Sequence, residues 1–312
     1  MLKRGIILFN RDLLERYLKE RLQLYFGEGQ RSHLIQEQEY QTIQRKVELY
    51  NKRNVSLVKV YGNLEVSNLW SENDITYINY TLHTRYFLKQ TDLYFEEDQE
   101  ERQMAIEKEE ILYDIAFPVD YHLEPFEVEE EEDIGESESI DRNSGYNRFN
   151  AVKYAETWWD GHNKEYPLYA NDCTNFISQC LRAGGVKMVG MPKPGAGWWY
   201  RNHSNSSYSW RVAHALRRFL PNAKSEIKAE EVSSQMQLSL GDIIIYDFEG
   251  DGIWNHCTMV VAKDENGEPL VNAHTVNSRK RYWSYYDSTA FTENIKYKFF
   301  HIIDGFSNPP ME

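Results

Sequence analysis

The sequence predicts an α+β protein in which a cysteine begins a helix that packs on an antiparallel sheet, after an N-terminal half of helices and antiparallel strands. Three observations predict this fold. A helical pattern of apolar residues begins at Cys173 and stops at Gly184-Gly185. β-branched runs separated by turn residues follow this helix. The first 126 residues show two amphipathic helices and then alternating strand patterns.

The N-terminal half is predicted to form an accessory α+β domain over residues 1–126. Apolar residues recur at helical spacing in two segments: Leu14, Tyr17, Leu18 and Leu22, and then Tyr40, Ile43, Val47 and Tyr50. Between residues 75 and 88 apolar side chains occupy alternate positions, which predicts a half-buried antiparallel strand. Residues 55–66 and 111–121 suggest its neighbours. We find no catalytic pattern there and expect this domain to bind a substrate or a protein partner.

An acidic segment separates the halves. Residues 127–144 include five consecutive acidic residues at positions 129–133. Such a block repels itself, so it indicates a solvated linker, with a calcium site or a basic partner as the alternative. The second domain is then expected over residues 145–312.

Cys173 is the candidate nucleophile. Unpaired backbone N–H groups and the helix dipole at a helix start favour the thiolate, and Asn171 or Asp172 can cap the same turn. A cysteine on the apolar face of a helix can also be simple packing, and this is the favoured interpretation for Cys180, two turns further along.

His256 is the candidate base, because it begins a β-branched run and can project from a sheet toward the helix of Cys173. The next residue, Cys257, should point to the opposite side of that strand and pack. A turn at residues 264–267 leads to a second strand, where Asn272 and His274 share one face. Either residue can orient the imidazole, although a hydrogen-bonded sheet residue is the alternative for His274.

The C-terminal half resembles a known family. The pattern consists of Tyr146-Asn147-Arg148, Asn171-Asp172-Cys173-Thr174-Asn175, Gly241-Asp242, Trp254-Asn255-His256 and His274-Thr275. It is similar to the family called "putative amidase domain", which is related to the NlpC/P60 and CHAP cysteine hydrolases. The resemblance implies a papain-like fold and cleavage of amide bonds, typically in peptidoglycan peptides of the bacterial cell wall. It also implies a catalytic triad with Cys173 as nucleophile, His256 as base and His274 as third member, with Asn272 as the substitute.

The expected mechanism passes through a thioester. Cys173 attacks the carbonyl, His256 protonates the leaving amine, and water releases the acyl group. Backbone N–H groups at the helix start, including that of Cys173, are suited to bind the oxyanion, with Asp172 and Thr174 as supporting residues. Acyl transfer to an amine and a catalytically silent binding module are the alternatives. No cofactor or metal is expected, because no His-Glu-x-x-His or Cys-x-x-Cys motif occurs.

A loop rich in aromatic residues follows the nucleophile helix. Trp198, Trp199 and Arg201 can line the approach to Cys173, with Arg201 meeting a substrate carboxylate, or the rings can form a packed cluster. Tyr169 lies just before the helix and can likewise reach the site or anchor its loop.

A second loop, at residues 247–252, begins like a calcium-binding loop. The position twelve residues from its start holds Thr258 in place of Glu, so we favour a polar turn over a bound cation.

Composition excludes several classes of function. The chain has 312 residues with a net charge of −14, which disfavours nucleic acid and an anionic membrane surface as partners. The three cysteines lack framework spacing and fit a reducing compartment or a free reactive thiol. A short apolar run near the N-terminus ends at Arg11-Asp12, so we expect a cytoplasmic protein, with a cell-wall or spore location as the alternative.

Overall fold

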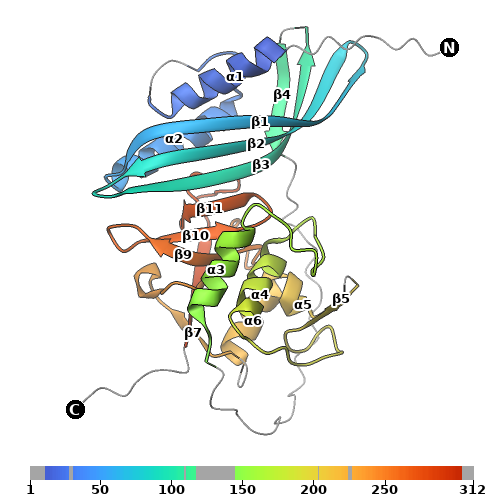
Figure 1. Ribbon diagram of the computed structural model, residues 1–312, viewed down its shortest axis with the longest axis vertical. Helices are drawn as coiled ribbons and strands as arrows, with labels where there is room; N and C mark the ends of the chain where they lie inside the picture. Colours follow the sequence, from blue (N-terminus) through green and yellow to red (C-terminus); the bar gives the residue numbers. More distant parts are fainter. Residues whose placement is uncertain are drawn as a thin grey trace, which may run out of the picture. The chain divides into compact units, whose positions relative to one another are not determined.

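The computed structural model forms two compact units, each of mixed α and β structure (Figure 1). The first contains Met1–Pro118 together with Ser284–Phe291, and the second contains Val119–Trp283 and Thr292–Glu312. The residues that the structure describes are 11–27, 31–108, 110–116, 145–202, 204–223 and 227–303. The predicted acidic linker, residues 127–144, lies outside them. Within the described residues, no helix combines the length and the apolar character needed to cross a membrane.

The first unit consists of two helices on an antiparallel sheet. Its elements are α1 (Arg11–Leu24), α2 (Glu37–Lys52), β1 (Ser56–Glu72), β2 (Ile75–Lys89), β3 (Leu93–Glu107) and β4 (Glu110–Ala116). The strands pair in chain order, β1-β2-β3-β4. Figure 1 shows both helices on one face of β1 and β2. Alternate residues of β2 from Ile78 to Leu88 are buried, which confirms the strand predicted there.

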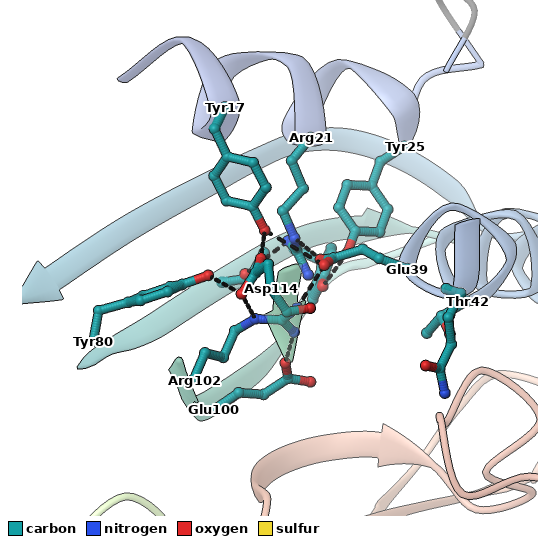
Figure 2. Close-up of polar contacts among 12 residues, drawn as sticks. Tyr17, Arg21, Tyr25, Glu39, Thr42, Tyr80, Glu100, Arg102 and Asp114 are labelled. Carbon is teal, nitrogen blue, oxygen red and sulfur yellow. Dashed lines mark hydrogen bonds and ion pairs between the residues drawn. The ribbon is translucent and has the colours of Figure 1, made fainter. Parts of the chain in front are cut away.

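The sequence did not predict β3, because seven of its fifteen residues are charged. The buried side chains of β3 include Arg102, which belongs to a buried network of charged groups and phenols beneath the two helices (Figure 2). Arg102 on β3 hydrogen-bonds to Glu39 of α2 and to Asp114 of β4, at 2.6 and 3.1 Å. Glu39 also accepts from Arg21 of α1. The two guanidinium groups balance the two carboxylates, so the charges are paired where they are buried.

Four tyrosines complete this network. Tyr17 of α1 and Tyr80 of β2 both donate their phenol hydrogens to Asp114, as Figure 2 shows. Burial and the neighbouring carboxylates raise the pKa of both phenols well above 10.0, so they remain donors. Tyr86 of β2 donates to the hydroxyl of Tyr25 at 3.0 Å. The helices are therefore joined to the sheet by polar contacts as well as by apolar packing.

A second buried charge cluster in the first unit centres on Lys46 of α2. Its ammonium group contacts Glu96 and Asp98 of β3 and Asp287 from the segment Ser284–Phe291. Burial lowers the pKa of Lys46, but the three carboxylates outweigh it and raise the pKa well above 10.5. This ion cluster ties the segment to the first unit although it is remote in sequence.

The second unit contains the predicted nucleophile helix and an antiparallel sheet. Its helices are α3 (Arg148–Trp158), α4 (Cys173–Ala183), α5 (Tyr208–Arg211) and α6 (Ala213–Asn222), with a short 3₁₀ helix, Gln235–Gln237. Its strands are β5 (Tyr200–Asn202), β6 (Asn205–Ser206), β7 (Ala229–Val232), β8 (Ile243–Asp247), β9 (His256–Lys263), β10 (Pro269–Ala273), β11 (Asn277–Tyr282) and β12 (Lys296–Ile302). The main strands run in the order β11-β10-β9-β8-β12-β7, and β5 pairs with β6.

Helices α3 and α4 pack on this sheet, and their shared core includes Cys173, Phe176 and Met259 (Figure 1). The predicted limits of the nucleophile helix are confirmed, since α4 starts at Cys173 and Gly184 occupies its C-cap. Gly184 must be glycine for a packing reason, because a Cβ atom there would lie 2.4 Å from the ring of Tyr146. The predicted hairpin of β9 and β10 is confirmed as well.

We predict that Arg102→Met destabilises the first unit by about 3–5 kcal/mol, because it leaves buried carboxylates without their partner. Urea unfolding followed by circular dichroism measures this change. Arg31→Met is the matched control, since Arg31 pairs with Glu37 at the surface, and the unfolding midpoint should not move. Equal midpoints for Arg102→Met and the wild type would show that the ion network does not hold this unit together.

Candidate active site

The start of α4 is held by a threonine on another segment. Cys173 is the first residue of the helix and is 3% exposed. The backbone N–H groups of Asp172 and Cys173 both donate to the hydroxyl oxygen of Thr275, each at 3.1 Å. Asp172 occupies the N-cap position, but its side chain accepts no capping hydrogen bond from a backbone N–H group of the helix. Of the two residues expected to cap this turn, Asn171 or Asp172, the side chain of Asp172 does not do so. The hydroxyl oxygen of Thr275 binds the first N–H groups instead.

The thiol of Cys173 has an environment that favours its ionised form. A hydrogen bond from the Cys257 thiol lowers its pKa, burial opposes this, and hydrogen bonding and charge from His256 lower it further. The Thr174 hydroxyl, 3.7 Å from the sulfur, adds a smaller contribution in the same direction. The pKa of Cys173 consequently lies well below the ordinary value of 9.0. Burial instead raises the pKa of Cys257, so the two thiols differ in character.

His256 is the first residue of β9 and is 1% exposed. Its ring lies against two aromatic side chains, with centroid distances of 5.5 Å to Tyr246 and 5.8 Å to Phe248. The sulfur of Cys173 is 4.0 Å from the carbonyl oxygen of Asn255, which immediately precedes this strand. The start of β9 thus lies beside the thiol, and hydrogen bonding and charge from His256 act on its sulfur.

His274 does not orient His256. Its Nδ1 is 2.8 Å from a carboxylate oxygen of Asp172, and its Nε2 is 2.7 Å from the carbonyl oxygen of Trp158. Both ring nitrogens are therefore engaged by Asp172 and Trp158, and neither is left to contact His256. The ring also stacks on Phe176, with centroids 3.8 Å apart. His274 therefore supports the loop before the nucleophile helix. The geometry does not support its expected role as the third member of the triad.

Asn272, the substitute orienter, is also engaged elsewhere. Its Nδ2 donates to the carbonyl oxygen of Ala155 at 3.2 Å and to Glu156 at 2.9 Å. Its Oδ1 accepts from the backbone N–H of Lys280 at 2.8 Å. The side chain consequently links α3 to β10 and β11, and it is not placed to hold the imidazole of His256.

The two predicted supporting residues, Asp172 and Thr174, flank Cys173 at the start of α4. Asp172 accepts from the backbone N–H of Tyr169 at 3.1 Å and from Nδ2 of Asn175 at 2.9 Å. Its carboxylate therefore fixes the loop before α4 in addition to pairing with His274. Thr174 lies between Cys173 and Cys257, and its Oγ1 is 3.4 Å from the sulfur of Cys257.

Sequence reasoning did not assign a role to Thr275. Its φ is +87°, a left-handed conformation that a β-branched residue rarely adopts. The pair His274-Thr275 stood in the family-like pattern, but no spacing or periodicity indicated that the hydroxyl reaches back to the helix start. Backbone strain of this kind persists where the surrounding structure enforces it, often at functional sites.

The two tryptophans after α4 are packed inside the unit. Trp198 and Trp199 are both fully buried. Nε1 of Trp198 donates to the hydroxyl of Ser178, and Nε1 of Trp199 donates to the carbonyl oxygens of Lys193 and Ala196. The structure supports the packed-cluster alternative and does not place these rings along an approach to Cys173.

The other two candidate substrate contacts differ from each other. The hydroxyl of Tyr169 is buried and has no hydrogen-bond partner among the described residues, although the side chain as a whole is only half-buried. Arg201 is exposed on β5, and no described contact joins it to the thiol. Tyr169, within the nucleophile loop, is therefore the better placed of the two.

The acidic loop before β9 is closed by its own backbone. Asp247 accepts hydrogen bonds from the N–H groups of Gly250, Asp251 and Gly252, at 2.7, 3.2 and 2.8 Å. This agrees with the polar turn favoured from the sequence, since the first carboxylate of the loop already has its donors. Over the described ranges, no three or more His, Cys, Asp or Glu side chains are arranged to hold a metal ion.

Comparison with known proteins identifies the family. The model described as "Putative amidase domain" matches residues 145–300. "Uncharacterized protein YhbB" of Bacillus subtilis (strain 168) is 43% identical over 299 residues, which cover 94% of this chain and 96% of that protein. The chain belongs to this amidase family. "Uncharacterized protein YjcM" of the same organism is 34% identical over 142 residues, 43% of this chain and 32% of that protein. No solved structure matches the chain.

The family assignment indicates amide hydrolysis in general terms. The amidase match spans Cys173, His256 and the residues that hold them. Because the alignment with YhbB covers nearly the whole chain, the accessory unit is shared with that relative as well.

We predict that Cys173 reacts with iodoacetamide near neutral pH, because only the thiolate reacts and its pKa is lowered. The rate should fall only as the pH drops through this lowered pKa. His256→Asn removes one cause of the lowered pKa, so the pH midpoint of the Cys173 labelling rate should rise. If this midpoint rises by one pH unit, the labelling rate at a pH below the midpoint falls about tenfold. Mass spectrometry of the labelled peptides gives the rates. Cys180 is the internal control, since burial raises its pKa, and equal labelling of Cys180 and Cys173 would contradict the assignment.

We also predict that Thr275→Val lowers the free energy of unfolding by about 1–3 kcal/mol, because it leaves two buried N–H groups without an acceptor. Valine keeps the size and β-branching of threonine, so the change isolates the hydroxyl. Thr275→Ser retains the oxygen and should be less destabilising than Thr275→Val. Denaturant titration compares the three proteins, and equal losses for Val and Ser would remove the hydroxyl from this role.

Proposed function

We propose that this amidase hydrolyses amide bonds through a thioester on Cys173. The observation that carries the proposal is a thiol at a helix start, with a lowered pKa, beside the imidazole of His256. In the first step the thiolate attacks the amide carbonyl, and His256 gives a proton to the leaving amine. In the second step water, deprotonated by His256, attacks the thioester and restores the thiol.

The start of α4 also supplies a way to stabilise the tetrahedral intermediate. The N–H groups of Asp172 and Cys173 converge on the hydroxyl oxygen of Thr275. An oxyanion that displaced this hydroxyl would accept the same two hydrogen bonds. In this mechanism the Thr275 oxygen occupies the oxyanion site before the substrate arrives, and the intermediate takes its place.

The proposed substrate is a peptide amide of the peptidoglycan type. This choice rests on the resemblance to hydrolases of cell-wall peptides, within the amide chemistry that the family description indicates. The hydroxyl of Tyr169, which has no hydrogen-bond partner among the described residues, can bond to such a peptide, because Tyr169 belongs to the loop that leads into Cys173. The accessory unit would bind the remainder of the substrate or a protein partner.

We predict that Cys173→Ala abolishes the release of peptide fragments from purified peptidoglycan, and that His256→Asn lowers it by roughly 10³-fold or more. Mass spectrometry identifies the amide that is cut. Cys180→Ala is the control, since Cys180 lies in the core and should leave the rate unchanged. Added amines distinguish hydrolysis from acyl transfer, because a transferase would give a new amide in place of the acid. Fragment release by Cys173→Ala equal to that of the wild type would overturn the proposal.

A further inference from the structure

A second cysteine lies directly beside the nucleophile. Cys257, the second residue of β9, is fully buried in the same core as Cys173. The two sulfurs lie 3.4 and 3.7 Å from one oxygen, the hydroxyl of Thr174. The thiol of Cys257 also lowers the pKa of Cys173. Two free thiols therefore lie on either side of one hydroxyl group at the position proposed for catalysis.

The two thiols have complementary chemistry. Cys173 is the one favoured as a thiolate, which is the form that reacts with peroxides. Cys257 is favoured as a protonated thiol, so it can supply the proton that a leaving hydroxide needs. A hydroperoxide is smaller than a peptide amide, so an opening that admits the proposed substrate to the sulfur also admits the oxidant.

We propose that Cys257 is a resolving cysteine, and that Cys173 and Cys257 form a reversible disulfide when the protein meets a hydroperoxide. The proposal takes Cys173 as the reactive thiol of the proposed function and adds a modification site to it. The disulfide removes the nucleophile while it exists, and it protects the sulfur from irreversible oxidation to the sulfinic acid.

The reaction balances in two steps. The thiolate of Cys173 attacks one oxygen of the hydroperoxide, the O–O bond breaks, and the other oxygen leaves as an alkoxide that takes up a proton to become an alcohol. The peroxide is reduced by two electrons and Cys173 becomes a sulfenic acid. The sulfur of Cys257 then attacks that of Cys173, and the S–O bond breaks. The departing hydroxide takes the thiol proton of Cys257 and leaves as water. A dithiol reductant restores both thiols.

The secondary structure supports this exchange. Cys257 is fixed in the central part of the sheet, between β8 and β10. Cys173 is the first residue of α4, and its sulfur lies beside the same hydroxyl group as the sulfur of Cys257. Because both sulfurs lie beside one oxygen, a change in the two side-chain conformations brings them together without moving the sheet. Cys180, two turns further along α4, is the matched control.

The test treats the full-length protein with hydrogen peroxide, blocks free thiols and maps the peptides by mass spectrometry without reductant. The expected product is a cross-linked pair of peptides containing residues 173 and 257, lost on addition of dithiothreitol and unchanged in Cys180→Ala. In Cys257→Ala, with folding checked by circular dichroism, the sulfinic acid at Cys173 should accumulate instead. The wild-type peptide map alone already decides the question if Cys257→Ala does not fold.

Two results would overturn the proposal. One is wild-type protein in which Cys173 goes to the sulfinic acid while Cys257 remains a free thiol, and the other is protein in which Cys173 stays reduced at peroxide levels that oxidise exposed thiols. The readout is a covalent bond and does not involve amide hydrolysis. A disulfide without amidase activity would count against the proposed function alone, and activity without a disulfide would count against this inference alone.

Discussion

The amidase unit depends on keeping an ionisable sulfur buried at the first residue of a helix. A buried thiolate is costly unless donors surround it, and here the thiol of Cys257 and the imidazole of His256 supply them. The sulfur can keep these partners only if the helix start stays in place. Thr275 holds its first N–H groups, and the contact of Asp172 with His274 anchors the preceding loop to the segment that follows β10. The surrounding contacts thus serve one purpose, which is to fix the position of a single atom.

The same constraint explains which parts of the site could be predicted from the sequence. Cys173 and His256 follow from local patterns, because a helix start and a strand start can be recognised from neighbouring residues. The partners of His274 could not be predicted in this way, since they depend on the path of the chain after β10. That path turns at Thr275, which has a positive φ that the sequence gives no reason to expect of a β-branched residue. A period of two residues along a strand identifies the shared face but not the neighbour that each side chain meets.

The fold shows a similar division between what is local and what is not. Strand β2 was predictable because its buried face is apolar at alternate positions. Strand β3 was not, because its buried residues include Glu96 and Arg102, which usually mark a solvated segment. Their counterions come from α2 and β4, which are Lys46 for Glu96 and both Glu39 and Asp114 for Arg102. These charges can be buried only because their partners, which are distant in sequence, are buried with them. The sequence around β3 alone therefore could not predict that the strand is buried.

Cys257 shows how packing at the end of a strand gives a residue two roles. Neighbouring residues of a strand point to opposite faces, which is why Cys257 was expected to pack on the side of β9 away from His256. Both nevertheless act on Cys173, whose sulfur lies beside the carbonyl oxygen of Asn255, just before β9 begins. An atom placed at the end of a strand can be reached from both faces. The donor that helps Cys173 to ionise is therefore a second sulfur, and the features that favour attack on an amide carbonyl also place a resolving thiol where oxidation of the nucleophile would need one.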